Sequence, residues 1–172
     1  MRILYGVLAG LVALVGVVIG VGWLLPVRHR AARQATYPAS PEAVFAAITR
    51  VEDFPRWRST VKTVDVLAGA PGAPSWRETG SDGVILYVAD RVTSPTGLVT
   101  RIADTSLPFG GTWTYELTPG SRGTTVRITE DGEVYNPLFR FMSRFVFGHH
   151  ATLETYLRDL GKHFGVTPII SG

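Results

Sequence analysis

The stretch NPLFRFMSRFVFGHHATLETYLRDLGKHF, residues 136–164, carries the strongest pattern in the chain. Pro137 suits the first position of a helix, because its ring fixes φ and its missing N–H is not needed there. Apolar residues then recur with a period close to 3.6; they are Leu138, Met142, Phe145, Val146, Leu153, Tyr156, Leu157, Leu160 and Phe164. Gly165 follows as a C-terminal cap. The pattern predicts one amphipathic helix of roughly 40 Å, which needs a broad partner surface.

Composition narrows the class of protein. The chain of 172 residues is long enough for one domain and an accessory segment. It contains no cysteine, which excludes disulfides, thiolate zinc sites and cysteine nucleophiles. The net charge is +3, but Arg2, Arg28, Arg30 and Arg33 all precede the first acidic residue, Glu42. The basic excess therefore belongs to the N-terminal region, and the rest of the chain lacks the basic balance that nucleic-acid binding requires.

Residues 3–25 form an uncharged run long enough to cross a hydrocarbon core of about 30 Å as a helix. Tyr5 and Trp23 stand near its ends, where amphipathic rings favour the headgroup region. A cleaved signal peptide is the alternative, but the run is long for one and no Ala-x-Ala site follows. We expect a retained, single-pass helix in the cell membrane, followed by a basic juxtamembrane linker over residues 26–33. The arginines after the run favour a cytoplasmic domain.

Beyond this run, the spacing of apolar residues along the chain changes twice. A strand is predicted over residues 30–37, then a helix that Ser40 caps and Pro41 begins. Pro55 should break that helix or begin a second short one. From Val61 onwards the apolar period is two, which predicts an antiparallel meander with one buried face. The predicted strands cover residues 61–67, 75–78, 84–92, 98–103, 112–118 and 124–135. Connections rich in Gly, Pro and Ser separate them, including residues 69–74, 94–97 and 119–123.

Alternation assigns each strand residue to a face. Arginines mark the solvated face, at positions Arg77, Arg91, Arg101 and Arg127. The inward set is Trp76, Val84, Leu86, Val88, Leu98, Ile102, Trp113, Tyr115, Leu117, Val126, Ile128 and Val134. The same parity puts Glu78, Asp90 and Glu130 inward, and a buried carboxylate is costly unless it is paired. We expect Glu78 and Asp90 at strand ends in water, whereas for Glu130 a solvated and a functional position remain equally open.

Two stretches carry a family resemblance: YPASPEAVFAAI at residues 37–48 and DFPRW at residues 53–57. With the long terminal helix they resemble the START-like superfamily, also called SRPBCC, which includes the polyketide cyclase/dehydrase and lipid-transport group. The resemblance covers residues 30–165. It implies an α+β helix-grip fold, in which a curved antiparallel sheet wraps around a long C-terminal helix and leaves an apolar cavity. We therefore expect a START-like domain over residues 34–165 and a C-terminal tail at residues 166–172.

Motifs for catalysis or metal binding are not found. No HExxH, Walker loop, GxGxxG after a strand or nucleophile elbow occurs, so no catalytic residue, cofactor or metal site is expected. His149 and His150 point about 100° apart on a helix, and His150 with Glu154 supplies too few ligands for zinc, so a surface pair is expected. His149 follows Phe145 by four residues on the face toward the sheet. It is either a polar contact for a ligand or a histidine at the edge of the core.

Three functions remain open from the sequence. The leading interpretation is a membrane-anchored domain that binds a lipid or other hydrophobic small molecule, with no nucleic-acid partner. The cavity that the resemblance implies would be lined by Trp113, Tyr115, Ile128, Glu130, Met142, Phe145, His149 and Leu153. The alternative is a cyclase/dehydratase-type enzyme that uses Glu130 with His149, Tyr115 or Tyr135 as acid and base. The third is a protein-interaction module, which a filled core would favour.

Overall fold

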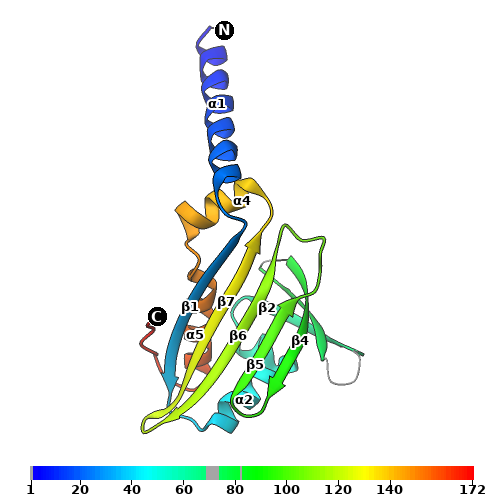
Figure 1. The fold of residues 1–172 in the computed structure, drawn as a ribbon, viewed down its shortest axis with the longest axis vertical. Coiled ribbons are helices and arrows are strands. Elements are labelled where there is room, and N and C mark those ends of the chain that lie inside the picture. The colour runs from blue at the N-terminus through cyan, green and yellow to red at the C-terminus, as the bar shows by residue number, and fades with distance from the viewer. Residues whose placement is uncertain (1, 69–73, 82) are drawn as a thin grey trace.

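The protein is described by a computed structural model over residues 2–68, 74–81 and 83–172, in which a seven-stranded antiparallel sheet carries helices on one face (Figure 1). An apolar helix, α1 (Arg2–Leu24), projects from one end. The strands are β1 (Arg28–Tyr37), β2 (Val61–Leu67), β3 (Ser75–Gly80), β4 (Gly83–Thr93), β5 (Gly97–Ile102), β6 (Phe109–Gly120) and β7 (Gly123–Val134). Their order is β1-β7-β6-β5-β4-β3-β2, so the first strand lies beside the last.

All seven predicted strands are present, with ends that differ by up to three residues. The strand β1 starts at Arg28 and not at Arg30, so most of the stretch expected as a basic linker belongs to the sheet. The expected tail is also ordered against β1, where the backbones of Gln34 and Ser171 exchange hydrogen bonds of 2.7 and 3.0 Å. The expected turn at residues 69–74 falls mainly on residues 69–73, which lie outside the described residues.

The predicted inward face of β4 is wrong. Ile85 and Ala89 are buried there, whereas Val84 is 49% exposed. The sequence from Val84 to Ala89 is apolar throughout, so it contains no alternation from which the buried face can be read. Beyond a register shift between Ala89 and Arg91, Asp90 lies in water and accepts a 2.8 Å hydrogen bond from Arg101, as expected for a solvated position.

The helical elements on the sheet are α2 (Pro41–Thr49), the 3₁₀ turn η1 (Val51–Asp53), α3 (Phe54–Trp57), α4 (Pro137–Met142), the π-helical turn η2 (Ser143–Phe147) and α5 (Ala151–His163). Three of them, α2, α3 and α4, begin at or next to the prolines that predicted them. The Ser40 side chain caps α2, and Pro41 is its first residue. Pro137 likewise begins α4. Gly165, with φ +71°, follows the end of α5 in a conformation that glycine adopts readily.

The single long C-terminal helix expected from residues 136–164 is wrong. The chain forms α4 and η2, then turns at Gly148, where φ is +75°, before α5 starts. Phe145 and Val146 continue the apolar period across this break, but both are exposed. The sheet therefore grips α5 alone, and α4 with η2 leaves in another direction (Figure 1).

The core lies between α5 and the central strands. Leu153, Leu157 and Leu160 are fully buried on α5 and belong to one apolar cluster with Ile128 of β7. The Tyr37 hydroxyl donates a 2.9 Å hydrogen bond to the backbone carbonyl of Leu157, which fixes the helix against the first strand. The molecule is thus an α+β helix-grip fold with an additional N-terminal helix.

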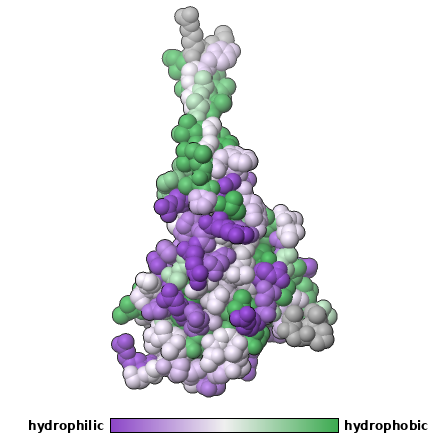
Figure 2. Space-filling model, in the orientation of Figure 1, coloured by the Kyte–Doolittle hydropathy of each residue, from purple (hydrophilic) through white to green (hydrophobic). Residues whose placement is uncertain are grey.

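The helix α1 is exposed along most of its length and meets the domain only at its base (Figure 2). By length and composition Ile3–Leu24 is able to cross a membrane, a property that it shares with signal sequences. At the base, a side chain on Gly22 would collide with the backbone of Pro137. The buried Arg140 guanidinium donates a 2.8 Å hydrogen bond to the Leu25 carbonyl. These contacts attach the end of α1 to α4.

Asp159 connects α5 to the turn before β2. Its buried carboxylate accepts a 2.8 Å hydrogen bond from the Ser59 backbone N–H, a second bond from the Ser59 hydroxyl and a 2.9 Å bond from Lys162. Burial opposes the charge, but these donors outweigh it and hold the pKa of Asp159 below its ordinary value of 3.8.

Replacing this carboxylate should weaken the fold in a pH-dependent way. Asp159→Asn should lower the free energy of unfolding at neutral pH by about 2 kcal/mol, because charge-assisted hydrogen bonds are lost. A depressed carboxyl pKa stabilises the fold above the unfolded-state pKa, and this contribution disappears as the pH falls through the folded-state value. Chemical unfolding should therefore show a difference between wild type and variant that shrinks below pH 3.8. A pH-independent difference, or one that exposed Asp65→Asn reproduces, would contradict this.

Candidate ligand-binding cavity

A cavity of about 650 Å³ lies between the sheet and the helices, next to the part of the sheet that α5 covers. Residues from β1, β3, β4, β5, β6 and β7 form its floor, and residues from α2, α3, α4, η2 and the start of α5 complete the wall. Aromatic side chains contribute much of the lining: Phe54, Trp76, Tyr87, Phe109, Trp113, Tyr115 and Phe139. The lining is therefore mainly apolar, with its ionisable side chains gathered at two places.

The first polar group is a buried ion pair beside α3. Glu78 of β3 is 6% exposed and accepts hydrogen bonds from Arg58 at 2.8 Å and from the Trp76 indole at 2.9 Å. The Arg58 guanidinium also lies over the rings of Phe54 and Tyr156, at 4.9 and 5.1 Å. Burial disfavours the charge on Arg58, but the Glu78 carboxylate more than offsets this and raises the pKa of Arg58. Arg58 and Glu78 therefore form a salt bridge inside the cavity wall.

The phenols next to this pair stay protonated. Burial is the main cause that raises the pKa of Tyr115 far above its ordinary value, and nearby Tyr156 raises it further. Burial likewise raises the pKa of Tyr156. Tyr115 lines the cavity, and its hydroxyl is hydrogen-bonded to that of Tyr156, so it is able to accept a hydrogen bond from a ligand but not to act as a phenolate base.

The second polar group lies at the end of the cavity near α1. His29 of β1 stacks on His149, with ring centroids 4.1 Å apart, and its Nε2 lies 3.7 Å from Oε1 of Glu130. The other carboxylate oxygen of Glu130 is buried and has no hydrogen-bond partner among the described residues. Burial and the neighbouring His29 lower the pKa of His149, and the negative charge of Glu130 opposes them only in part. His149 is therefore neutral at pH 7 and carries a free lone pair.

The structure places five of the eight predicted cavity residues in the lining: Trp113, Tyr115, Glu130, Met142 and His149. The other three lie elsewhere. Ile128 and Leu153 are fully buried in the core, and Phe145 is 59% exposed on η2. The predictions for Ile128 and Leu153 fail because α5 packs directly on that part of the sheet and leaves no space. The prediction for Phe145 fails because the helix breaks at Gly148.

Sequence reasoning missed several polar residues of the cavity. His29 stands between Arg28 and Arg30, a sequence context that is typical of a basic linker. It lines the cavity because β1 pairs with β7, where His29 lies opposite Gly132. Glu78 was expected in water but is buried, because Arg58, twenty positions earlier, pairs with it. Glu78 lies two positions after the inward-facing Trp76 on β3, and this alternation was the signal that could have placed it inside.

Two further expectations concern polar pairs outside the cavity. Glu154 bonds to Arg33 at 3.3 Å and Arg158 at 2.7 Å, so the expected surface pair with His150 is wrong. Tyr135 does not line the cavity; its hydroxyl donates to Glu133 at 2.7 Å, which raises the pKa of Tyr135. Within the part of the chain that the structure describes, no cluster of three His, Asp or Glu residues is arranged to hold a metal ion.

The ion pair gives a direct test of the cavity's construction. Arg58→Met should lower the free energy of unfolding by about 3–5 kcal/mol, because it leaves Glu78 buried without a countercharge. Adding Glu78→Gln should restore part of this loss, since the amide still accepts from Trp76 and carries no charge. Denaturant unfolding followed by tryptophan fluorescence measures both. Losses that simply add in the double variant would show that the two side chains do not interact.

Comparison with known proteins places the fold. A START superfamily protein from Mycobacterium smegmatis aligns with a TM-score of 0.64 at 18% identity, covering 80% of this chain and 97% of that one. The Zhui aromatase/cyclase from Streptomyces sp. R1128 aligns with a TM-score of 0.61 at 12% identity, covering 78% and 93%. The di-domain ARO/CYC StfQ from the steffimycin biosynthetic pathway aligns at 0.59 and 15% identity, covering 80% of this chain but 50% of StfQ. This chain therefore spans about half the length of StfQ. Identities this low show a shared fold alone.

Sequence comparison is more specific. A search of curated protein sequences finds no significant match. Residues 28–160, most of the chain after α1, match the family described as polyketide cyclase / dehydrase and lipid transport. The chain therefore belongs to the polyketide cyclase/dehydrase and lipid transport family.

Proposed function

We propose that the protein is a membrane-anchored binding domain that holds a lipid or another hydrophobic small molecule between the sheet and α4, η2 and α5. The observation that carries this proposal is the cavity of about 650 Å³, lined mainly by aromatic and aliphatic groups. Sites for hydrophobic ligands have this size and composition, with a few polar groups that orient the ligand. The family's description, which includes lipid transport, agrees with it.

The polar groups define the chemistry of the ligand. Arg58 is already neutralised by Glu78, so this end of the cavity does not require a charged ligand. Tyr115 and neutral His149 offer hydrogen bonds instead. The strands β3 and β7, which carry Glu78 and Glu130, lie four strand spacings apart, roughly 20 Å along the sheet. A largely apolar molecule with hydroxyl or carbonyl oxygens near its ends fits this arrangement.

The anchor part of the proposal rests on α1. The side chains of its span Ile3–Leu24 are uncharged and mostly exposed, which suits a bilayer, and the arginines that follow α1 favour a cytoplasmic domain. The contacts at its base support a retained helix over a cleaved signal. Cleavage beyond Leu25 would remove the acceptor of the buried Arg140 guanidinium and the close packing of Gly22 on Pro137.

Bulky side chains in the cavity lining should weaken ligand binding. Ser143→Trp and Ala151→Trp each place an indole at the cavity, so both should weaken binding of a fluorescent long-chain fatty acid or sterol by about tenfold or more. Val66→Trp, on exposed β2, is the matched control and should bind like wild type. Titration of full-length protein in detergent measures this, with circular dichroism as the check on folding. Absence of saturable binding by wild type, or equal binding by all variants, would overturn the proposal.

A second candidate function is acid–base catalysis of the cyclase or dehydratase type. The buried oxygen of Glu130, which has no hydrogen-bond partner among the described residues, lies beside His29 and favours this function, because a carboxyl group next to an imidazole is able to exchange protons with a ligand. His29 takes the place of the tyrosines that sequence analysis considered. The third interpretation, a filled interaction module, has no support from a domain that holds such a cavity.

The catalytic candidate has its own test. Full-length protein is incubated with linear poly-β-ketoester mimics, and mass spectrometry measures cyclisation or loss of water. Glu130→Gln should reduce turnover by about a hundredfold or more while fluorescent-ligand binding is retained. Glu116→Gln, on the exposed side of β6, is the control. If wild type is inactive, or the Glu130 variant keeps full activity, this function is excluded for these substrates or for this residue, respectively.

A further inference from the structure

We propose that the segment Pro137–Phe147, which comprises α4 and η2, lies in the headgroup–acyl boundary of the bilayer that α1 crosses, and forms a lipid-facing rim of the cavity. The inference deepens the proposed function and rests on it for the anchor and the cavity. Its occupant is a lipid surface, and no second protein is needed to cover the segment.

The segment exposes more apolar surface than a water-facing helix requires. Leu138, Phe139, Phe145 and Val146 are all exposed within nine positions, and Phe145 and Val146 are 59% and 57% exposed. Elsewhere in the described part of the domain, exposed apolar residues such as Val66 of β2 and Val84 and Val92 of β4 are spaced apart, the last two by eight positions. A contiguous apolar patch on an otherwise polar domain marks an interaction surface.

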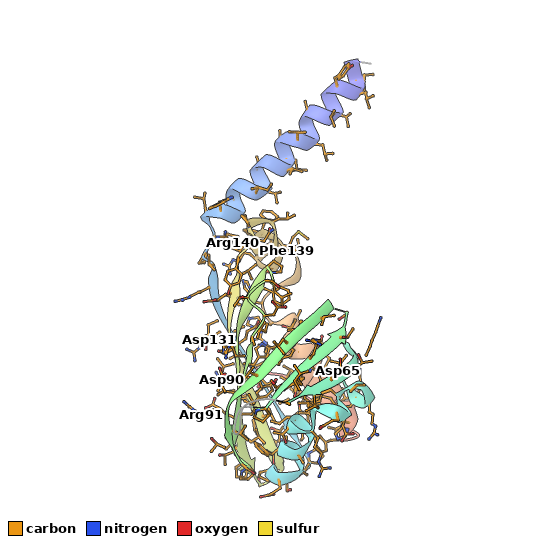
Figure 3. The ribbon with its side chains drawn as sticks, turned by 90° about the vertical axis from the view of Figure 1, so that its right-hand side faces the viewer. Asp65, Asp90, Arg91, Asp131, Phe139 and Arg140 are labelled. Atoms are coloured by element: carbon orange, nitrogen blue, oxygen red, sulfur yellow. The ribbon has the colours of Figure 1, made fainter. Side chains whose placement is uncertain are left out.

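The position of the segment identifies its partner. Arg140 binds the Leu25 carbonyl at the C-terminal end of α1, and its guanidinium lies 5.9 Å from the Trp23 ring. Trp23 itself is 68% exposed, as expected for a ring in the headgroup region. Figure 3 shows Phe139 and Arg140 together at the foot of α1. If α1 spans the bilayer, α4 therefore starts at the level where the hydrocarbon ends.

The charge pattern fits the same partner. No acidic residue occurs between Asn136 and Leu153, whereas Arg140 and Arg144 do. The Arg140 guanidinium is occupied by backbone carbonyls, and Arg144 is exposed. Aromatic and aliphatic side chains combined with arginine and without carboxylates are typical of segments that lie in the membrane interface next to anionic lipids.

The segment also borders the cavity. Phe139, Met142 and Ser143 line it, together with Gly148 at the break and His149 beyond. The same short segment therefore carries side chains that are exposed, such as Phe145 and Val146, and side chains that line the cavity, such as Met142. A hydrophobic ligand that passes this rim enters the acyl region and not water, which removes the main cost of release.

Single-cysteine labelling tests the placement, because the chain contains no cysteine of its own. The full chain is reconstituted in vesicles of phosphatidylcholine and phosphatidylglycerol, with a nitroxide at position 145, 66 or 12. Accessibility to oxygen and to a water-soluble nickel chelate is then compared. The label at 145 should favour oxygen, as the label at 12 does, whereas the label at 66 should favour nickel. A label at 145 that behaves like the one at 66 overturns the inference even when 12 is buried in lipid; a label at 12 in water overturns the anchor as well.

Transfer kinetics test the role of the rim. Phe145→Asp combined with Val146→Asp should slow transfer of a fluorescent fatty acid from vesicles to the protein by about tenfold, because the rim no longer enters the interface. Val66→Asp combined with Val92→Asp is the matched control and should transfer like wild type. Equilibrium binding in detergent should be the same for all three proteins. Equal transfer rates for the three proteins would overturn the inference. If wild type does not bind the fatty acid in detergent, the proposed function fails instead. The nitroxide labels would then still decide where the segment lies.

Discussion

The helix that covers the sheet is much shorter than the strands beneath it, and the cavity follows from this difference. The strands β6 and β7 have 12 residues each and reach roughly 40 Å, whereas α5 has 13 residues and reaches roughly 20 Å. Gly148, with φ +75°, ends the covering layer by turning the chain away. Leucines on α5 fill one half of the concave face. The other half, from Trp113 towards α1, is covered by α4, η2 and the first residues of α5, and the cavity remains between them and the sheet.

An open apolar cavity in water is unfavourable, so its walls must be held apart by rigid contacts. At one side Arg58 and Glu78 form a buried salt bridge. The Trp76 indole also donates to Glu78, and the Arg58 guanidinium lies over the Phe54 ring. At the other side the stacked rings of His29 and His149 close the wall beside Glu130. These groups leave a cavity that is mostly apolar, with ionisable side chains at two fixed places. Under the proposed function, such a site would select ligands by shape and by a few oxygens, not by charge.

Local sequence patterns predicted most of the fold, and their failures share a physical cause. Strand alternation, Pro41, Pro55 and Pro137 located nearly every element, because each depends on neighbours in the chain. Periodicity failed at Phe145 because the apolar period runs on through residues 136–164 although the helix breaks at Gly148. It failed in β4 because both faces there are apolar. Glu78 and His29 were not predicted as cavity residues, because their partners, Arg58 and Glu130, come from other elements and only the folded sheet brings them together.

The central claim is that the cavity holds a hydrophobic molecule taken from the membrane. Native mass spectrometry of the full chain, purified from membranes in mild detergent, tests it most directly. The account predicts one lipid-like or otherwise apolar species bound per chain, present in preparations from different hosts and reduced in Ser143→Trp. Ligand-free protein in every host, or the same amount of bound species on Ser143→Trp, would contradict this claim.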